Sequence, residues 1–174
     1  ESGEQNKTIA ICNEVWQTIG ESKADRKSII VNLGGGVVCD MGGMIASLYK
    51  RGIKFFHIPT TLLAQVDASI GGKLAVDLGA HKNQIGLFNN PDIVLVDTEF
   101  LKTLPEKHWL SGLAEVFKHA LIADEQYWDF LAGLDLNNDE FLNVLVQKSV
   151  ELKNNIVLQD WEEKGLRKIL NFGH

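Results

Sequence analysis

The sequence predicts an α/β fold with a parallel sheet in its first part and an all-helical second part. Three observations predict it. Over the first hundred residues, β-branched apolar runs alternate with stretches of helical periodicity. The first such run, 29–36, ends in three glycines directly before a helical stretch. After Pro105 helical periodicity continues and no strand pattern returns. We therefore expect two partial domains, over 1–104 and 105–174.

The first part alternates strands and helices in an order typical of right-handed βαβ crossovers. Gly20 and Gly52 fit helix C-terminal positions, while Pro59 ends one strand and Pro91 precedes another. The expected helices span 7–20, 37–52 and 61–69, and the expected strands span 29–36, 53–60 and 92–100.

The second part has two long amphipathic stretches and no internal repeat. We expect helices over 106–134 and 138–172, the second interrupted by an acidic loop around Asp160.

Composition narrows the class of protein. The chain has 174 residues, a formal net charge of -6, 45% hydrophobic residues and 23% charged residues, which is typical of a globular protein. The acidic balance disfavours nucleic acid and anionic membranes as partners but leaves a small phosphate substrate open. Cys12 and Cys39 give no disulfide framework or metal spacing. Without a membrane-length apolar run or a signal peptide we expect a cytoplasmic protein, and Glu1 suggests that the natural start lies upstream.

The stretch "NLGGGVVCD" combines a strand, glycines and a helix start. Backbone amides of such a turn can hold a phosphate at the positive end of a helix, whereas a tight turn alone would also explain the glycines. Asp40 suits either ribose hydroxyls or the helix dipole.

A second polar region follows the strand that ends at Pro59. Thr60 and Thr61 lie at a strand end, where open α/β sheets bind ligands. Lys73 follows two glycines, and Lys82 and Asn83 lie in another glycine-containing loop. A single lysine is usually a solvated charge, but this combination indicates anion recognition.

The helical part offers a carboxylate and several cations. Glu115 and Lys118 share a helix face, as a surface ion pair or as a metal ligand beside a substrate-binding lysine. We expect His119 to be a surface or packing residue. Arg167, Asn171 and His174 fall at i, i+4 and i+7 of one predicted helical face. If Glu115 and His174 converge, two of the three protein ligands of a catalytic zinc are present.

These motifs, in this order, resemble the 3-dehydroquinate synthase family of sugar-phosphate cyclases. The matching stretches are "GEQNK", "LGGGVVCD", "KRG", "PTTLLAQVDASIGGK", "KNQIGLFNNP", "LKTLP", "SGLAEVFKHALI" and "GLRKILNFGH". The resemblance implies a Rossmann-like NAD domain followed by a helical domain that binds metal and substrate. It also implies that the sequence is truncated at both ends and that this stretch alone is inactive.

The resemblance assigns ligands to individual positions. The metal, Zn²⁺ or Co²⁺, would be bound by Glu115 and His174, with a third ligand outside the sequence. Arg51 matches a position that reaches a neighbouring subunit, which implies a homodimer. The implied NAD contacts are Glu4, Lys7, Gly36, Val37, Val38, Cys39, Asp40, Thr60, Thr61, Lys73, Lys82, Phe100, Leu101, Lys102 and Thr103. The implied substrate contacts are Arg51, Asp67, Lys73, Asn83, Lys118, Lys153, Arg167 and Asn171.

The implied reaction converts 3-deoxy-arabino-heptulosonate 7-phosphate to 3-dehydroquinate and phosphate, a step of aromatic amino acid biosynthesis. It proceeds by transient oxidation with NAD, phosphate elimination, reduction and intramolecular aldol closure. Alternatives are a 2-deoxy-scyllo-inosose or valiolone-type cyclase, a polyol or glycerol-1-phosphate dehydrogenase, and an inactive nucleotide-binding fragment. Net NADH formation would distinguish a dehydrogenase from a cyclase.

Overall fold

The computed structural model describes residues 3–173, and the chain divides into two compact units. Unit 1 comprises Glu1–Pro59 and Gly72–Leu95, and unit 2 comprises Thr60–Gly71 and Val96–His174. The division thus differs from a single boundary at residue 104. The reason is that the segment after Pro59 packs with the helices of unit 2 before the chain returns to unit 1.

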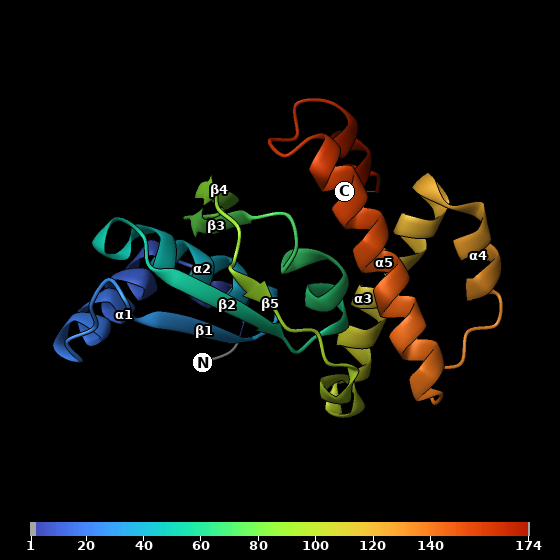
Figure 1. Ribbon diagram of the computed structural model, residues 1–174, viewed down its shortest axis with the longest axis horizontal. Helices are drawn as coiled ribbons and strands as arrows, with labels where there is room; N and C mark the ends of the chain where they lie inside the picture. Colours follow the sequence, from blue (N-terminus) through green and yellow to red (C-terminus); the bar gives the residue numbers. More distant parts are fainter. Residues whose placement is uncertain (1–2, 174) are drawn as a thin grey trace. The chain divides into compact units, whose positions relative to one another are not determined.

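Unit 1 contains a parallel sheet in the order β1-β2-β5, with strands β1 (Ile29–Gly34), β2 (Lys54–Pro59) and β5 (Ile93–Val94). Helices α1 (Ile9–Glu21) and α2 (Gly36–Leu48) alternate with the strands, as Figure 1 shows. Thr8 caps α1 through its hydroxyl, which accepts from the Ile11 amide. The predicted parallel arrangement is confirmed, but the third strand is much shorter than 92–100.

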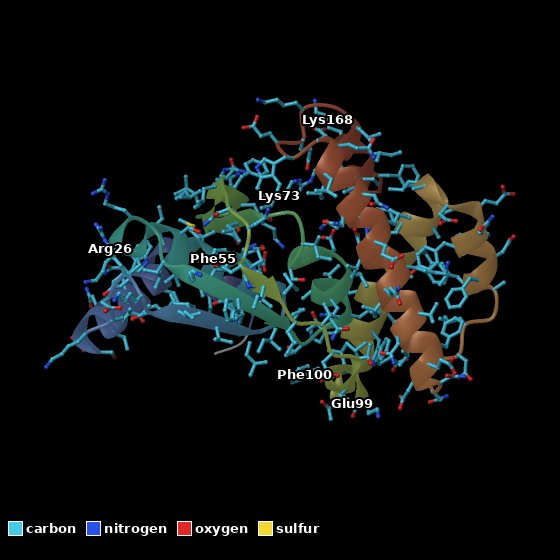
Figure 2. All side chains as sticks on the ribbon, in the orientation of Figure 1. Arg26, Phe55, Lys73, Glu99, Phe100 and Lys168 are labelled. Atoms are coloured by element: carbon cyan, nitrogen blue, oxygen red, sulfur yellow. The ribbon has the colours of Figure 1, made fainter. Side chains whose placement is uncertain are left out.

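Two further strands of unit 1 were not predicted. Strands β3 (Lys73–Leu78) and β4 (His81–Phe88) form an antiparallel hairpin where the sequence suggested lysine-bearing loops. Gly79 turns the chain with a φ of +59°. Lys73 begins β3 and is exposed (Figure 2).

The core of unit 1 lies between the helices and the strands. It consists of buried apolar side chains from α1, α2, β2 and β3, including Cys12, Met44, Phe55 and Val76. Both cysteines are free thiols, and burial raises the pKa of Cys39 to about 12. Cys39 therefore packs as a small apolar residue.

Unit 2 is helical. It contains α3 (Glu106–Ala123), α4 (Glu125–Leu131) and α5 (Asp139–Gln159), with short helical segments η3 (Ala64–Ala68), η4 (Thr98–Thr103) and η5 (Leu166–Asn171). Beyond β5, no strand occurs up to residue 173, as the sequence predicted. Within residues 3–173, no helix is long and apolar enough to cross a membrane.

Two predicted long helices are interrupted. Asp124 adopts an extended backbone that ends α3, and its carboxylate accepts from the Tyr127 amide to cap α4 (2.8 Å). The predicted helix 106–134 is therefore two helices. The expected interruption around Asp160 is confirmed, since α5 ends at Gln159, but the segment after the loop is the 3₁₀ segment η5 instead of a further α-helix.

The core of unit 2 joins the 60–71 segment to the helices. Buried apolar residues such as Leu62, Val66, Val116 and Leu145 form one cluster. Gly112 lets α3 approach this segment closely, because a Cβ atom there would lie 2.6 Å from Leu62 Cβ. This close packing brings α3 next to η3, which carries Asp67.

Candidate functional site

The principal polar cluster of unit 2 contains two carboxylates, two ammonium groups and one imidazole. Asp67 comes from the π-helical η3, Glu115, Lys118 and His119 come from α3, and Lys153 comes from α5. All but Asp67 are at least nine-tenths buried. Charged groups are rarely so buried unless paired, and π-helical turns often mark functional sites.

The Lys153–Asp67 pair joins residues far apart in sequence. Lys153 donates to the Asp67 carboxylate and, at 2.6 Å, to the Asp67 main-chain carbonyl. Burial raises the pKa of Asp67, but attraction and hydrogen bonding from Lys153 outweigh it and lower the pKa to about 2. Asp67 is therefore ionised at neutral pH.

Glu115 is the second carboxylate. Lys118 donates to Glu115 Oε1 and, at 2.6 Å, to the carbonyl of Leu170 in η5. The expected spacing on one helix face is confirmed, but the pair is buried, which a surface ion pair would not be.

His119 is buried, which fits the packing alternative and excludes the surface one. It is 0% exposed, and its Nε2 lies 3.3 Å from Glu115 Oε1. Ligand atoms of Asp67, Glu115 and His119 lie within 4.8 Å of one another, an arrangement that can hold a cation. The sequence feature that could have indicated the proximity of His119 to Glu115 is their i, i+4 spacing, which places both residues on one helix face.

Arg167 lies in the same unit but in a different role from the one its spacing suggested. It is 1% exposed, and its guanidinium donates to the carbonyls of Trp161 (2.6 Å) and Gly71 (2.9 Å). Asn171 is exposed and donates to Glu163 instead. The predicted α-helix is a 3₁₀ segment here, in which Arg167 is buried and Asn171 exposed, although both side chains reach the Glu163 carboxylate. The proposed metal ligand His174 lies outside the described residues.

The remaining unit 2 candidates vary in exposure. Thr61 Oγ1 accepts from the Ala64 amide (3.2 Å). Leu101 is 1% exposed in the core, so only its main chain is available to a ligand. Lys102 is exposed and forms ion pairs with Glu99 (2.6 Å) and Asp139 (3.1 Å).

Unit 1 holds a second polar group, centred on Lys7. Lys7 is 3% exposed and donates to Asp40 Oδ2 and Asn83 Oδ1, both at 2.6 Å. Its carbonyl accepts from the Asp77 amide, and Asp77 accepts from the Asn83 amide, each at 2.8 Å. Lys7 thus links the first turns of α2 to the hairpin, a link that sequence reasoning missed.

The glycine turn of unit 1 has the expected local form. The helix α2 begins at Gly36 directly after β1, and Gly35 is its N-cap residue. The side chain of Cys39 is buried while Val38 is exposed, so the main chain of this turn is the part suited to a phosphate.

The other candidates of unit 1 lie at its surface. Lys82 pairs with Glu4 at 3.4 Å, both partly exposed. Arg51 is exposed in a turn where its φ is +74°.

Together, the glycine turn before α2 in unit 1 and the polar cluster around the buried Glu115 in unit 2 are features suited to a nucleotide phosphate and to a cation, as in cofactor- and metal-dependent enzymes. Two family models match the chain, 3-dehydroquinate synthase N-terminal over residues 1–111 and 3-dehydroquinate synthase C-terminal over residues 112–174. The chain belongs to the 3-dehydroquinate synthase family.

Similar sequences agree with this family. The chain is 48% identical to the 3-dehydroquinate synthases of Sulfurovum sp. (strain NBC37-1) and Campylobacter concisus (strain 13826), each over 172 residues. The alignments cover 99% of this chain and 49% and 50% of those proteins. The chain therefore spans about half the length of the relatives it matches.

Similar structures agree with the fold. A 2-epi-5-epi-valiolone synthase from Streptomyces hygroscopicus subsp. jinggangensis 5008, with NAD⁺ and Zn²⁺ bound, matches with a TM-score of 0.94 and 31% identity. The match covers 100% of this chain and 50% of that one. A 2-deoxy-scyllo-inosose synthase matches with a TM-score of 0.87 and 27% identity over 100% of this chain and 49% of that one.

Proposed function

We propose that the protein to which this chain belongs is a 3-dehydroquinate synthase, an NAD- and divalent-metal-dependent carbon–oxygen lyase that acts in the cytoplasm as a homodimer. It would convert 3-deoxy-arabino-heptulosonate 7-phosphate to 3-dehydroquinate and phosphate. The observation that carries the proposal is the 48% identity to 3-dehydroquinate synthases over 99% of the chain. The valiolone and inosose cyclases are less similar, at 31% and 27%.

The unit 2 cluster fits a divalent metal, because Glu115 supplies a buried carboxylate beside an imidazole and a second carboxylate. When bound there, the metal would polarise substrate oxygens as a Lewis acid. Glu115 would bind it together with His174 and a third ligand outside this sequence. Lys118 and Lys153 would donate to the anionic groups of the substrate, and Asp67 would accept from its hydroxyls.

The unit 1 elements fit the dinucleotide. NAD would reversibly accept hydride from the substrate, and the main chain of residues 36–40 would hold its pyrophosphate. Asp40, held in place by Lys7, would accept from ribose hydroxyls. Lys73 and Lys82 supply exposed positive charge in the same unit.

The test is turnover by the intact protein with NAD and Zn²⁺. We expect phosphate release and 3-dehydroquinate formation in equal amounts, without net NADH. Net NADH formation would support a dehydrogenase and refute the proposal. Turnover of a heptulose or hexose phosphate to valiolone or inosose products, without 3-dehydroquinate, would refute the substrate assignment.

A further inference from the structure

His119 is a buried polar side chain to which the proposed chemistry gives no task. It lies on α3, one turn after Glu115, with an exposed fraction of 0%. Burying an imidazole among apolar groups is unfavourable unless a partner compensates its lost hydration. Neither ring nitrogen has a hydrogen-bond partner among the described residues, and the ion-pair-range contact of its Nε2 is with Glu115 Oε1 at 3.3 Å.

The contact between His119 Nε2 and Glu115 Oε1 lies beside a second contact to the same oxygen. Lys118 also reaches Oε1, so an ammonium and an imidazole approach the same carboxylate oxygen. Lys118 is additionally tied to the Leu170 carbonyl, whereas His119 is fixed by burial inside unit 2. The Lys118 ammonium is therefore divided between two acceptors, whereas the imidazole approaches Glu115 with no hydrogen-bond partner among the described residues.

Metal-binding carboxylates need such a neighbour. A donor behind a metal ligand fixes the ligand's orientation, and its loss typically weakens metal affinity about 10–100-fold. A direct ligand role for His119 is the alternative, since its ring is among the groups placed to hold a cation, and the Co²⁺ spectrum of H119Q distinguishes the two roles.

We propose that His119 is a positioning residue that holds the Glu115 carboxylate, through Nε2, in the orientation that binds the metal. This inference rests on the proposed function, in which Glu115 is a metal ligand. With a proton on Nε2, the ring can donate to Oε1 once the carboxylate adopts its metal-binding orientation.

The test measures metal affinity in the intact protein, by Zn²⁺ titration against a chelator and by the visible absorption of bound Co²⁺. His119→Gln places an amide N–H close to the position of Nε2. His119→Asn carries the same amide on a side chain one bond shorter, so its N–H does not reach that position. We expect Zn²⁺ affinity within about threefold of wild type for H119Q and about 10–100-fold weaker for H119N. His108→Gln, an exposed histidine on the same helix, is the matched control and should change nothing.

Equal affinities for H119Q, H119N and wild type would overturn the inference, as would equal losses in H119Q and H119N. Co²⁺ bands displaced in H119Q would also overturn it, because they would make His119 itself a ligand. Glu115→Gln separates the two proposals. If E115Q keeps full Zn²⁺ affinity, the proposed metal site fails. If E115Q loses Zn²⁺ while H119N does not, only the positioning role fails.

Discussion

Gly71 offers a direct test of what Arg167 does. Its φ is +92°, and a Cβ atom there would lie 2.5 Å from Arg167 Nη2 and 3.0 Å from Val157 Cγ2. The same guanidinium nitrogen donates to the Gly71 carbonyl at 2.9 Å. Gly71→Ala must therefore strain the backbone and push the guanidinium away from its partner.

The expected cost follows from these two effects. A left-handed backbone costs a non-glycine residue roughly 1–2 kcal/mol. Losing a buried hydrogen bond from a charged donor costs about 1.5–3 kcal/mol. Gly71→Ala should thus lower the free energy of unfolding by about 2.5–5 kcal/mol.

The matched control is Gly79→Ala. Gly79 also has a positive φ, +59°, but a Cβ atom there meets nothing within 4 Å. It should cost about 1–2 kcal/mol, the backbone contribution alone. Urea unfolding of both variants, analysed by linear extrapolation, measures the difference.

A double-mutant cycle tests whether the additional destabilisation by Gly71→Ala, relative to Gly79→Ala, comes from Arg167. Lysine has one nitrogen in place of the Nη1 and Nη2 that donate separately to Trp161 and Gly71, so Gly71→Ala should cost clearly less in an Arg167→Lys background. If G71A is no more destabilising than G79A, or if its cost is unchanged in R167K, then Arg167 does not anchor the glycine-rich turn.

Three further variants test the polar groups. Burial lowers the pKa of His57 from 6.5 to about 4. The free energy of unfolding should therefore fall by up to about 3 kcal/mol as the pH is lowered from 6.5 to 4. His57→Gln should reduce this pH dependence, as measured by urea unfolding at a series of pH values. Lys118→Met removes a cation that competes with the metal for Glu115. Zn²⁺ titration should therefore show about tenfold tighter binding, while turnover falls. Weaker Zn²⁺ binding would contradict the proposed competition. Lys7→Met removes the ammonium partner of Asp40 and should lower the free energy of unfolding by about 2–3 kcal/mol. It should also weaken NAD binding, measured by fluorescence titration. Unchanged stability and unchanged NAD affinity would contradict the role of Lys7.

The sequence predicted most of the fold because hydrophobic periodicity, and the glycine and proline residues at the ends of elements, are local signals of secondary structure. The parallel strands β1 and β2 and the helices between them follow from apolar runs and glycine ends. The hairpin β3–β4 was missed because its polar and glycine residues resemble a loop. Apolar residues do alternate at Leu74, Val76 and Leu78, but strand pairing is a non-local property that this short pattern only weakly signals.

The helix boundaries show the same limit. Asp124 lies inside a stretch with good helical periodicity, whereas the acidic residues around Asp160 indicated a loop but not the 3₁₀ segment after it. Each carboxylate accepts main-chain amides, Tyr127 for Asp124 and three amides between 164 and 167 for Asp160. Such local hydrogen bonds compete with the helix, and periodicity alone does not register them.

For the candidate site, residue types were predictable but pairings were not. Asp67 and Lys153 are 86 residues apart, and Lys7 and Asn83 are 76 apart. Which ammonium meets which carboxylate depends on the packing of whole elements. For His119 the sequence left surface and packing open for a related reason, since only tertiary burial separates an inward-facing imidazole from a surface one.

The pairings also constrain how the unit 2 cluster can work. Two ammonium groups already neutralise its two carboxylates, so a divalent metal on Glu115 adds charge that the cluster must redistribute. Lys118 is the group that shares Oε1 of Glu115, while Lys153 is held by both the carboxylate and the main-chain carbonyl of Asp67. Metal binding should therefore free Lys118 rather than Lys153, placing a cation where an anionic substrate needs a donor. On this reasoning metal and substrate bind cooperatively, and Lys118→Met should abolish that cooperativity while Zn²⁺ still binds.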